Sequence, residues 1–299
     1  MFMGIVDILQ TTIGGIANGA TYGLIGLGVV FLWQSVNRVN FANISSCMLS
    51  VYIFYALSNR STGNFTVAII GGIVLTSLYG LALRFLIYEP ITRRGGGGME
   101  FVIATLMLSV FWMATISAIF TGIVWPFPRE VGDPAALMYM GPLQIPVVYV
   151  RILVIVAVLI VSLHIFLRKT FIGKMLRATA QNREAAQLMG ININLTTSVS
   201  FVLSTTMVGI AGLLLAPFYY VSLDLGGGSI GLKGFAAAVM AGLTDPYGAI
   251  LGGITIGIIE NFSTLYISSA FKDVVSFLIL IAVMLWKPRG IFNWTKMGD

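Results

Sequence analysis

The sequence predicts an all-α integral membrane protein, a polytopic helical bundle with about eight to nine transmembrane segments. Of the 299 residues, 58% are hydrophobic and 9% are charged, whereas soluble globular chains carry about 25% charged residues. Several apolar stretches reach the ~20 residues that a helix needs to cross the ~30 Å hydrocarbon core of a bilayer. No stretch shows the alternation of transmembrane β-strands. We therefore expect a single membrane domain over residues 1–299.

Hydropathy places eight longer segments and one shorter segment along the chain. The shorter segment, 231–243, spans only ~20 Å at ~1.5 Å per residue. We expect a short or broken helix there, which must be shielded by protein because lipid cannot satisfy free backbone groups. The longer segments are 13–33, 40–57, 65–88, 99–121, 148–168, 198–221, 247–269 and 271–287.

The basic residues predict the orientation, because cytoplasmic loops of membrane proteins carry an excess of Lys and Arg. When the loop at 169–197 is taken as cytoplasmic, most of the 17 Lys and Arg residues fall on the inner side. This assignment requires nine crossings, with the N-terminus outside, the C-terminus inside and an external loop at 122–147. The basic residues left outside are Arg60, Arg129, Arg151, Lys233 and Lys272.

Glycine recurs at four-residue spacing in the first span and again late in the chain. Residues one turn apart share a helix face, so each set forms a groove in which another backbone can approach closely. We interpret these grooves as helix-packing seams, with the lining of a translocation path as the alternative. The glycines are Gly15, Gly19, Gly23, Gly248, Gly252, Gly253 and Gly257.

The basic loop at 169–197 contains the pattern of a short capped helix. Asn182 suits the N-cap, Glu184 is favourable in the first turn and Gly190 suits the stop. Such a helix would transmit force as a rigid lever; the alternative is an amphipathic helix that rests on lipid head groups. Glu184-Ala185-Ala186, followed after three residues by Gly190, resembles the cytoplasmic loop by which importer permeases engage their ATP-binding subunits, and this resemblance implies a coupling helix. The candidate docking residues are Arg177, Arg183, Glu184, Ala185, Ala186 and Gly190.

Four polar side chains are candidates for a substrate path, because polar and ionisable groups inside a membrane are costly and often functional. Glu260 would contact a substrate ammonium, take up a proton, or pair with Lys272 or another subunit. The asparagines would hydrogen-bond a zwitterion or join neighbouring helices. The candidate path residues are Asn18, Asn40, Asn43 and Glu260.

The sequence contains no recognisable catalytic or metal-binding constellation. We find no paired catalytic acids, no histidine pair and no nucleophile with an evident base, which disfavours an intramembrane enzyme. Cys47 and His164 are each the only residue of their type, so no Cys/His metal cluster is expected. The glycine run at 95–98 is not followed by Lys-Ser/Thr, so it is not a phosphate-binding loop of the Walker type. Basic residues in separate loops argue against a nucleic-acid partner.

Three stretches together resemble one family of membrane proteins over nearly the whole chain. The resemblance is to the permease family of high-affinity branched-chain amino acid importers, in its LivH-like branch. The stretches are Asn18-Gly19-Ala20 through Tyr22-Gly23-Leu24 to Asn40-Phe41-Ala42, then Leu188-Met189-Gly190-Ile191, and last Phe235-Ala236-Ala237-Ala238 through Gly252-Gly253.

This resemblance implies a permease subunit of an ATP-binding cassette importer in the bacterial plasma (inner) membrane, which moves branched-chain or related small amino acids inward by alternating access. It implies two cytoplasmic ATP-binding subunits that hold ATP and Mg, a second related permease subunit and a periplasmic solute-binding protein. This chain itself would need no cofactor. The alternative is a stand-alone ion-coupled carrier or channel with Glu260 as the coupling carboxylate. Urea, short amides and aromatic acids stay open as substrates, as does the choice between a homodimer and a heterodimer.

Overall fold

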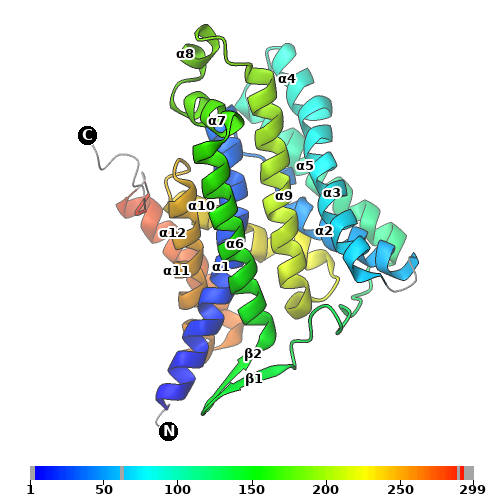
Figure 1. Cartoon of the computed structure of the whole chain (residues 1–299), viewed down its shortest axis with the longest axis vertical. Helices are drawn as coiled ribbons and strands as arrows, with labels where there is room; N and C mark the ends of the chain where they lie inside the picture. Colours follow the sequence, from blue (N-terminus) through cyan, green and yellow to red (C-terminus); the bar gives the residue numbers. More distant parts are fainter. Residues whose placement is uncertain (1–3, 61–63, 288–289, 293–299) are drawn as a thin grey trace.

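A computed structural model describes residues 4–60, 64–287 and 290–292. These residues form an elongated helical bundle. The N-terminal end of α1 (Ile5–Val36) lies at the same end of the bundle as a small β-hairpin, while the short helices α4 (Glu89–Arg93), α7 (Phe171–Gln181) and α8 (Arg183–Leu188) lie at the opposite end (Figure 1).

Seven helical segments of the described chain are long and apolar enough to cross a membrane. This finding confirms a polytopic helical membrane protein. Two further helices, α10 (Gly228–Met240) and α12 (Lys272–Trp286), are shorter. The seven are α1, the 3₁₀ turn Phe41–Asn43 with α2 (Ser45–Arg60), α3 (Phe65–Leu83) continued by a π-helical turn (Arg84–Tyr88) into α4, α5 (Gly98–Phe120), α6 (Val147–Lys169), α9 (Ile193–Tyr219) and α11 (Pro246–Tyr266).

Several helix boundaries follow from local capping. The side chains of Thr170, Asn182 and Asn192 accept hydrogen bonds from backbone N–H groups in the first turns of α7, α8 and α9. Asp245 does the same for α11, where Pro246 occupies the first position. The cap at Asn192 starts α9 inside the loop predicted at 169–197, so the helix is longer at its beginning than the hydropathic segment 198–221.

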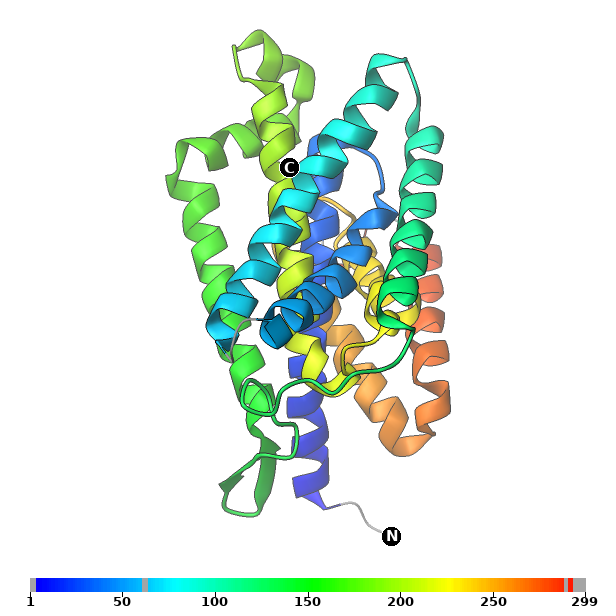
Figure 2. The ribbon, with the colours of Figure 1, turned by 90° about the vertical axis from the view of Figure 1, so that its right-hand side faces the viewer.

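Helix α1 occupies the centre of the bundle. Its apolar window is 89% buried, compared with 11% for α5 and 22% for α6. It packs against α6, α9, α10 and α11, and α5 stands on the side of the bundle away from α6 (Figure 2). The exposed apolar faces of α5 and α6 therefore belong to the periphery, where lipid or another subunit covers them in a membrane.

Glycines bring α1 and α11 into backbone contact. A Cβ atom added at Gly15 would lie 2.7 Å from the Cα of Ile258, and one at Gly23 would lie 2.8 Å from the Cα of Ile250. A larger residue would push the two helices apart. Gly19, Gly253 and Gly257 also face backbone atoms of the opposite helix, whereas Gly252 and Gly248 face Ala237 and Phe292.

Helix α10 is the short segment anticipated at 231–243. It has 13 residues and follows a 3₁₀ turn, Leu223–Gly226, that connects it to the end of α9. Most of its residues are buried because α1, α11 and α12 surround it. This shielding satisfies the condition under which a broken helix is tolerated in a membrane.

The loop predicted at 122–147 contains the one sheet of the described chain, a small hairpin added to a mostly helical fold. Strands β1 (Leu137–Met140) and β2 (Leu143–Pro146) pair antiparallel, and Gly141 supplies the turn with a φ of +64°. Strands of four residues are too short to show a reliable alternation of apolar and polar residues, so the sequence did not reveal them. The same loop is tied to the end of α9 by two backbone hydrogen bonds between Trp125 and Val221, of 3.1 and 2.9 Å.

Candidate translocation and docking sites

Three charged side chains meet inside the bundle, from three consecutive helices. The Lys233 Nζ atom of α10 lies 2.7 Å from Glu260 Oε1 of α11 and 2.6 Å from Asp273 Oδ1 of α12. The side chains of Lys233, Glu260 and Asp273 are 0%, 6% and 38% exposed. We call these three residues the charge cluster. Its two inner members are fully enclosed, and Asp273 alone reaches the surface.

The charge cluster corrects two sequence-based expectations. Lys233 was placed among the external basic residues, but it is completely buried. Of the three roles expected for Glu260, the pairing role named Lys272 or another subunit as the partner. The structure gives Glu260 Lys233 as its partner, while Lys272 Nζ lies 5.8 Å from the centre of the Tyr219 ring. Lys233 falls within the short hydrophobic segment 231–243. A lysine buried in a membrane needs a carboxylate partner, so this position could have predicted an ion pair with an acidic residue of another span.

Asn18 lies within α1, whereas Asn40 and Asn43 lie at the 3₁₀ turn that precedes α2. Asn40 and Asn43 begin the second span and are 5% and 0% exposed, and no side-chain nitrogen or oxygen of either has a hydrogen-bond partner in the described chain. Asn43 faces α1 and α9, since a Cβ at Gly28 would contact both Asn43 Nδ2 and Ser204 O. Asn18 is only partly buried. The structure thus leaves two buried amides, Asn40 and Asn43, able to bind a polar group.

The loop predicted at 169–197 forms two helices rather than one. Helix α7 buries Met175, Leu176 and Thr179 and was missed because a single amphipathic face of 11 residues gives a weak hydropathic signal. Helix α8 matches the predicted capped helix: the Asn182 side chain accepts a hydrogen bond from Ala185 N at 3.0 Å, and Gly190 has a φ of +81°.

Helix α8 presents an apolar end to its surroundings. Leu188 and Met189 are 88% and 84% exposed, and Glu184 and Ala185 are also exposed. Ala186, by contrast, is 4% exposed and turns inward. Large exposed apolar side chains at the end of a polar helix mark a surface that a partner or lipid covers.

Of the two arginines expected to dock, one already has a partner inside the chain. Arg183 Nη1 donates a hydrogen bond to the backbone oxygen of Ser35, at the end of α1, with a length of 2.6 Å. Arg177 is exposed on α7. Arg183 therefore joins α8 to the central helix.

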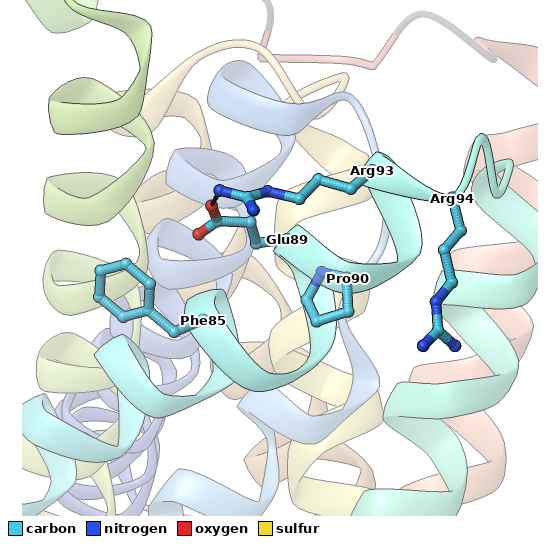
Figure 3. Close-up of a pocket in the computed structure, with 5 residues that line it drawn as sticks. All are labelled: Phe85, Glu89, Pro90, Arg93 and Arg94. Carbon is cyan, nitrogen blue, oxygen red and sulfur yellow. Dashed lines mark hydrogen bonds and ion pairs between the residues drawn. The ribbon is translucent and has the colours of Figure 1, made fainter.

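A surface pocket of about 420 Å³ lies beside α4 and contains none of the predicted path residues; it is lined by Phe85, Glu89, Pro90, Arg93 and Arg94. Arg93 is turned toward Glu89 and pairs with it at 2.5 Å, whereas Arg94 points away from this pair (Figure 3). Arg93 is thus neutralised locally. The pocket lies at the α8 end of the bundle, so we do not assign the translocation site to it.

No group of three His, Cys, Asp or Glu side chains in the described chain is arranged to hold a metal ion. Cys47 is buried, and its thiol donates to the Val208 oxygen at 3.3 Å. His164 Nδ1 lies 2.6 Å from the Tyr247 hydroxyl. Both residues therefore make ordinary interhelical contacts.

The family model described as the branched-chain amino acid transport system / permease component matches residues 11–284. This chain belongs to that family. This chain is 30% identical to the high-affinity branched-chain amino acid transport system permease protein LivH of Escherichia coli K12, and the alignment covers 95% of each chain. It is 28% identical to the corresponding permease BraD of Pseudomonas aeruginosa, with 97% of each chain covered.

A solved structure shares the permease fold. PsaBC from Streptococcus pneumoniae in complex with Fab matches with a TM-score of 0.52 and 15% identity, over 97% of this chain and 95% of that chain. At this level of identity the likeness concerns the fold alone. The LivH-like family permease is therefore a multi-pass helical membrane protein.

Proposed function

We propose that this permease is the membrane-spanning subunit of an ATP-binding cassette importer that moves branched-chain or related small amino acids inward by alternating access. The family membership and the likeness to LivH over 95% of both chains support this function. The relatives carry the substrate class in their names. A second related permease subunit and a periplasmic solute-binding protein would complete the assembly in the inner membrane.

The proposed topology has nine crossings, with the N-terminus outside and the C-terminus inside. Seven come from the long apolar segments, and α10 and α12 supply the other two. The arrangement is supported by α1 starting at the hairpin end and by α7 and α8 lying at the other end (Figure 1). The region 122–147 is then the external loop and 169–197 the cytoplasmic loop.

The exposed end of α8 is the observation that carries the proposed docking to an ATPase. Leu188 and Met189 are almost fully exposed although they are apolar, which suits a helix that inserts into a partner groove. Glu184, Ala185 and Gly190 border this end, and Arg177 adds a cation on α7. The Arg183 hydrogen bond to Ser35 would carry a movement of α8 to the central helix α1. Separate cytoplasmic subunits would bind and hydrolyse MgATP.

The proposed path includes Asn18, Asn40, Asn43 and Glu260. An unpaired buried amide costs free energy, on the order of 1–3 kcal/mol for each polar group left without a partner. Asn40 and Asn43 are both in this condition. A polar solute or water passing between α1, α2 and α9 would satisfy them, so two unpaired buried amides favour a transport role over simple packing.

The experiment for this function is purification of the tagged permease from native membranes, mass spectrometry of its partners and an ATPase assay. We expect ATP-binding subunits to copurify and to lose coupling in Glu184→Arg, because the substitution reverses a charge on the exposed face of α8. Glu130→Arg is the matched control, since Glu130 is an exposed acid in the loop near the hairpin. A permease that purifies without ATP-binding subunits and still moves solute in liposomes would instead establish the alternative function, a stand-alone ion-coupled carrier or channel.

A further inference from the structure

The charge cluster surrounds one ammonium group, that of Lys233, with two carboxylates. The carboxylates of Glu260 and Asp273 approach the same nitrogen, Lys233 Nζ, at 2.7 and 2.6 Å. The contact with Glu260 is a charge-assisted hydrogen bond, whereas the contact with Asp273 is a close ion pair in which Oδ1 accepts no well-aligned hydrogen bond. Because Glu260 and Asp273 come from different helices, the packing of α11 and α12 around α10 sets their separation. The pair is thus prearranged to surround an ammonium.

The charge cluster carries one more negative than positive charge when all three groups are ionised. Glu260 Oε2 is buried and has no hydrogen-bond partner in the described chain. A buried carboxylate oxygen without a partner is costly, and the protein offers it no second cation inside the cluster. Lys272 lies nearby but faces the ring of Tyr219. Tyr22 of α1 also borders the cluster, because Lys233 Nζ lies 5.5 Å from the centre of its ring and its hydroxyl lies beside Glu260. Glu260 Oε2 accepts no hydrogen bond in the described chain and faces this enclosed space with Tyr22 as its neighbour.

The charge cluster can be approached from one side. The Asp273 side chain is 38% exposed although its partner Lys233 is enclosed. Helix α12 begins near the hairpin end of the bundle and runs toward the opposite end (Figure 2). A solute entering from the hairpin end would therefore meet Asp273 before it met Lys233 or Glu260.

From this geometry we infer that the charge cluster binds the head group of a zwitterionic amino acid during its passage. The substrate ammonium takes the place of the Lys233 ammonium between Glu260 and Asp273, and the substrate carboxylate pairs with the released Lys233. No covalent bond changes and no net charge is added. Every buried charge keeps a partner of opposite sign, and the long flexible side chain of Lys233 permits the exchange.

The same charge pattern selects against the other solutes of similar size. An uncharged molecule such as urea or a short amide would separate Lys233 from both carboxylates and leave buried charges unpaired. An organic anion would meet the surplus negative charge. The inference rests on the proposed transport function and narrows its substrates to those that carry both an ammonium and a carboxylate.

The test measures ligand binding to the purified permease–ATPase complex without the solute-binding protein, as a shift of the thermal unfolding midpoint. The probes are leucine, 4-methylpentanoate, which lacks the ammonium, and 3-methylbutylamine, which lacks the carboxylate. The key variant is Lys233→Met/Glu260→Gln/Asp273→Asn, which removes all three charges together and leaves none unpaired. The matched control is Arg84→Met/Glu89→Gln/Arg93→Gln, which removes the three charges of a different group of ion pairs at the α8 end of the bundle.

We expect leucine alone to raise the midpoint, in the wild type and in the control, and to have no effect on the triple variant. Leucine uptake by the complete importer should fall about tenfold or more in the triple variant, because a site built for charged groups discriminates strongly. Copurification of the ATP-binding subunits should persist in the triple variant. Loss of copurification in the wild type would refute the importer itself, independently of the binding result.

Two results would overturn the inference. If either analogue shifted the unfolding midpoint as much as leucine, binding would not require both the ammonium and the carboxylate of the ligand. If the triple variant transported leucine within about twofold of the wild type, the three charges would only hold α10 against α11 and α12, since such buried pairs can be replaced without loss of structure.

Discussion

At the residue scale, Asn43 is the clearest case in which stability and function oppose each other. Its side chain is fully buried, and neither the amide nitrogen nor the amide oxygen has a partner in the described chain. Asn194 is different, because its Oδ1 accepts a hydrogen bond from Arg84 Nη2 at 3.2 Å. Two asparagines of the same chain therefore predict opposite responses to an apolar replacement.

We expect Asn43→Leu to raise the stability of the purified permease by about 1 kcal/mol, because an unpaired amide is exchanged for an apolar group of similar size. Leucine uptake should fall at the same time, as in other trade-offs between activity and stability. Asn194→Leu should lower stability, because it leaves the Arg84 guanidinium without this acceptor. Thermal unfolding and uptake assays measure both effects. A destabilised Asn43→Leu that transports normally would assign Asn43 to packing.

Local residue properties that depend on neighbouring sequence were predictable. Asn182 caps α8 and Gly190 ends it, because a cap needs only the backbone groups of the next turn. The partner of Glu260 was not predictable in the same way. Lys233 is 27 residues away along the chain, and its pairing depends on how α10 packs against α11.

At the element scale, the close contact of α1 with α11 depends on glycine, because glycine has no side chain to separate the two backbones. The Cα atoms of Ile250 and Ile258 approach Gly23 and Gly15 so closely that no Cβ fits. Tight backbone approach increases van der Waals contact, which is the main attraction between helices in lipid. The glycine spacing was visible in the sequence, but the pairing of the first span with a span near the end of the chain was not.

We expect Gly15→Val to destabilise the permease by about 1–3 kcal/mol, because overpacking forces the helices apart. Gly98→Val is the matched control, since a Cβ at Gly98 meets no atom within 4 Å. The unfolding midpoint of each purified variant, measured in the same detergent, compares the two. Equal midpoints for the two variants would show that the α1–α11 contact is looser than described.

At the scale of the whole molecule, the two ends of the bundle differ in kind. One end carries the β-hairpin and the loop that Trp125 ties to Val221. The other end carries α7 and α8, whose exposed side chains include Arg177, Glu184 and Leu188. In the proposed topology, the end that carries α7 and α8 is the cytoplasmic side. A membrane would then lie across the middle of the bundle, around the apolar faces of α5 and α6.

We expect a single cysteine at Tyr139 to react with a membrane-impermeant maleimide in intact cells, and one at Leu188 to react only in inverted vesicles. Both positions are highly exposed, at 69% and 88%. The background variant is Cys47→Ala, which removes the only native cysteine. Labelling of Leu188→Cys from outside intact cells would reverse the proposed orientation and remove the docking site from the ATPase side.

The amino-acid sequence was sufficient to predict the membrane class, the approximate positions of the spans, the capped helix at Asn182 and the family. These features depend on composition, on runs of apolar residues and on local capping, which need no knowledge of distant contacts. Only the tertiary structure decided that Lys233 is buried between Glu260 and Asp273, that Arg183 bonds to the end of α1, and that Asn40 and Asn43 lack partners. The physical reason is that each depends on which helices pack together. Hydropathy records the preference of a segment for lipid but contains no information about its neighbours.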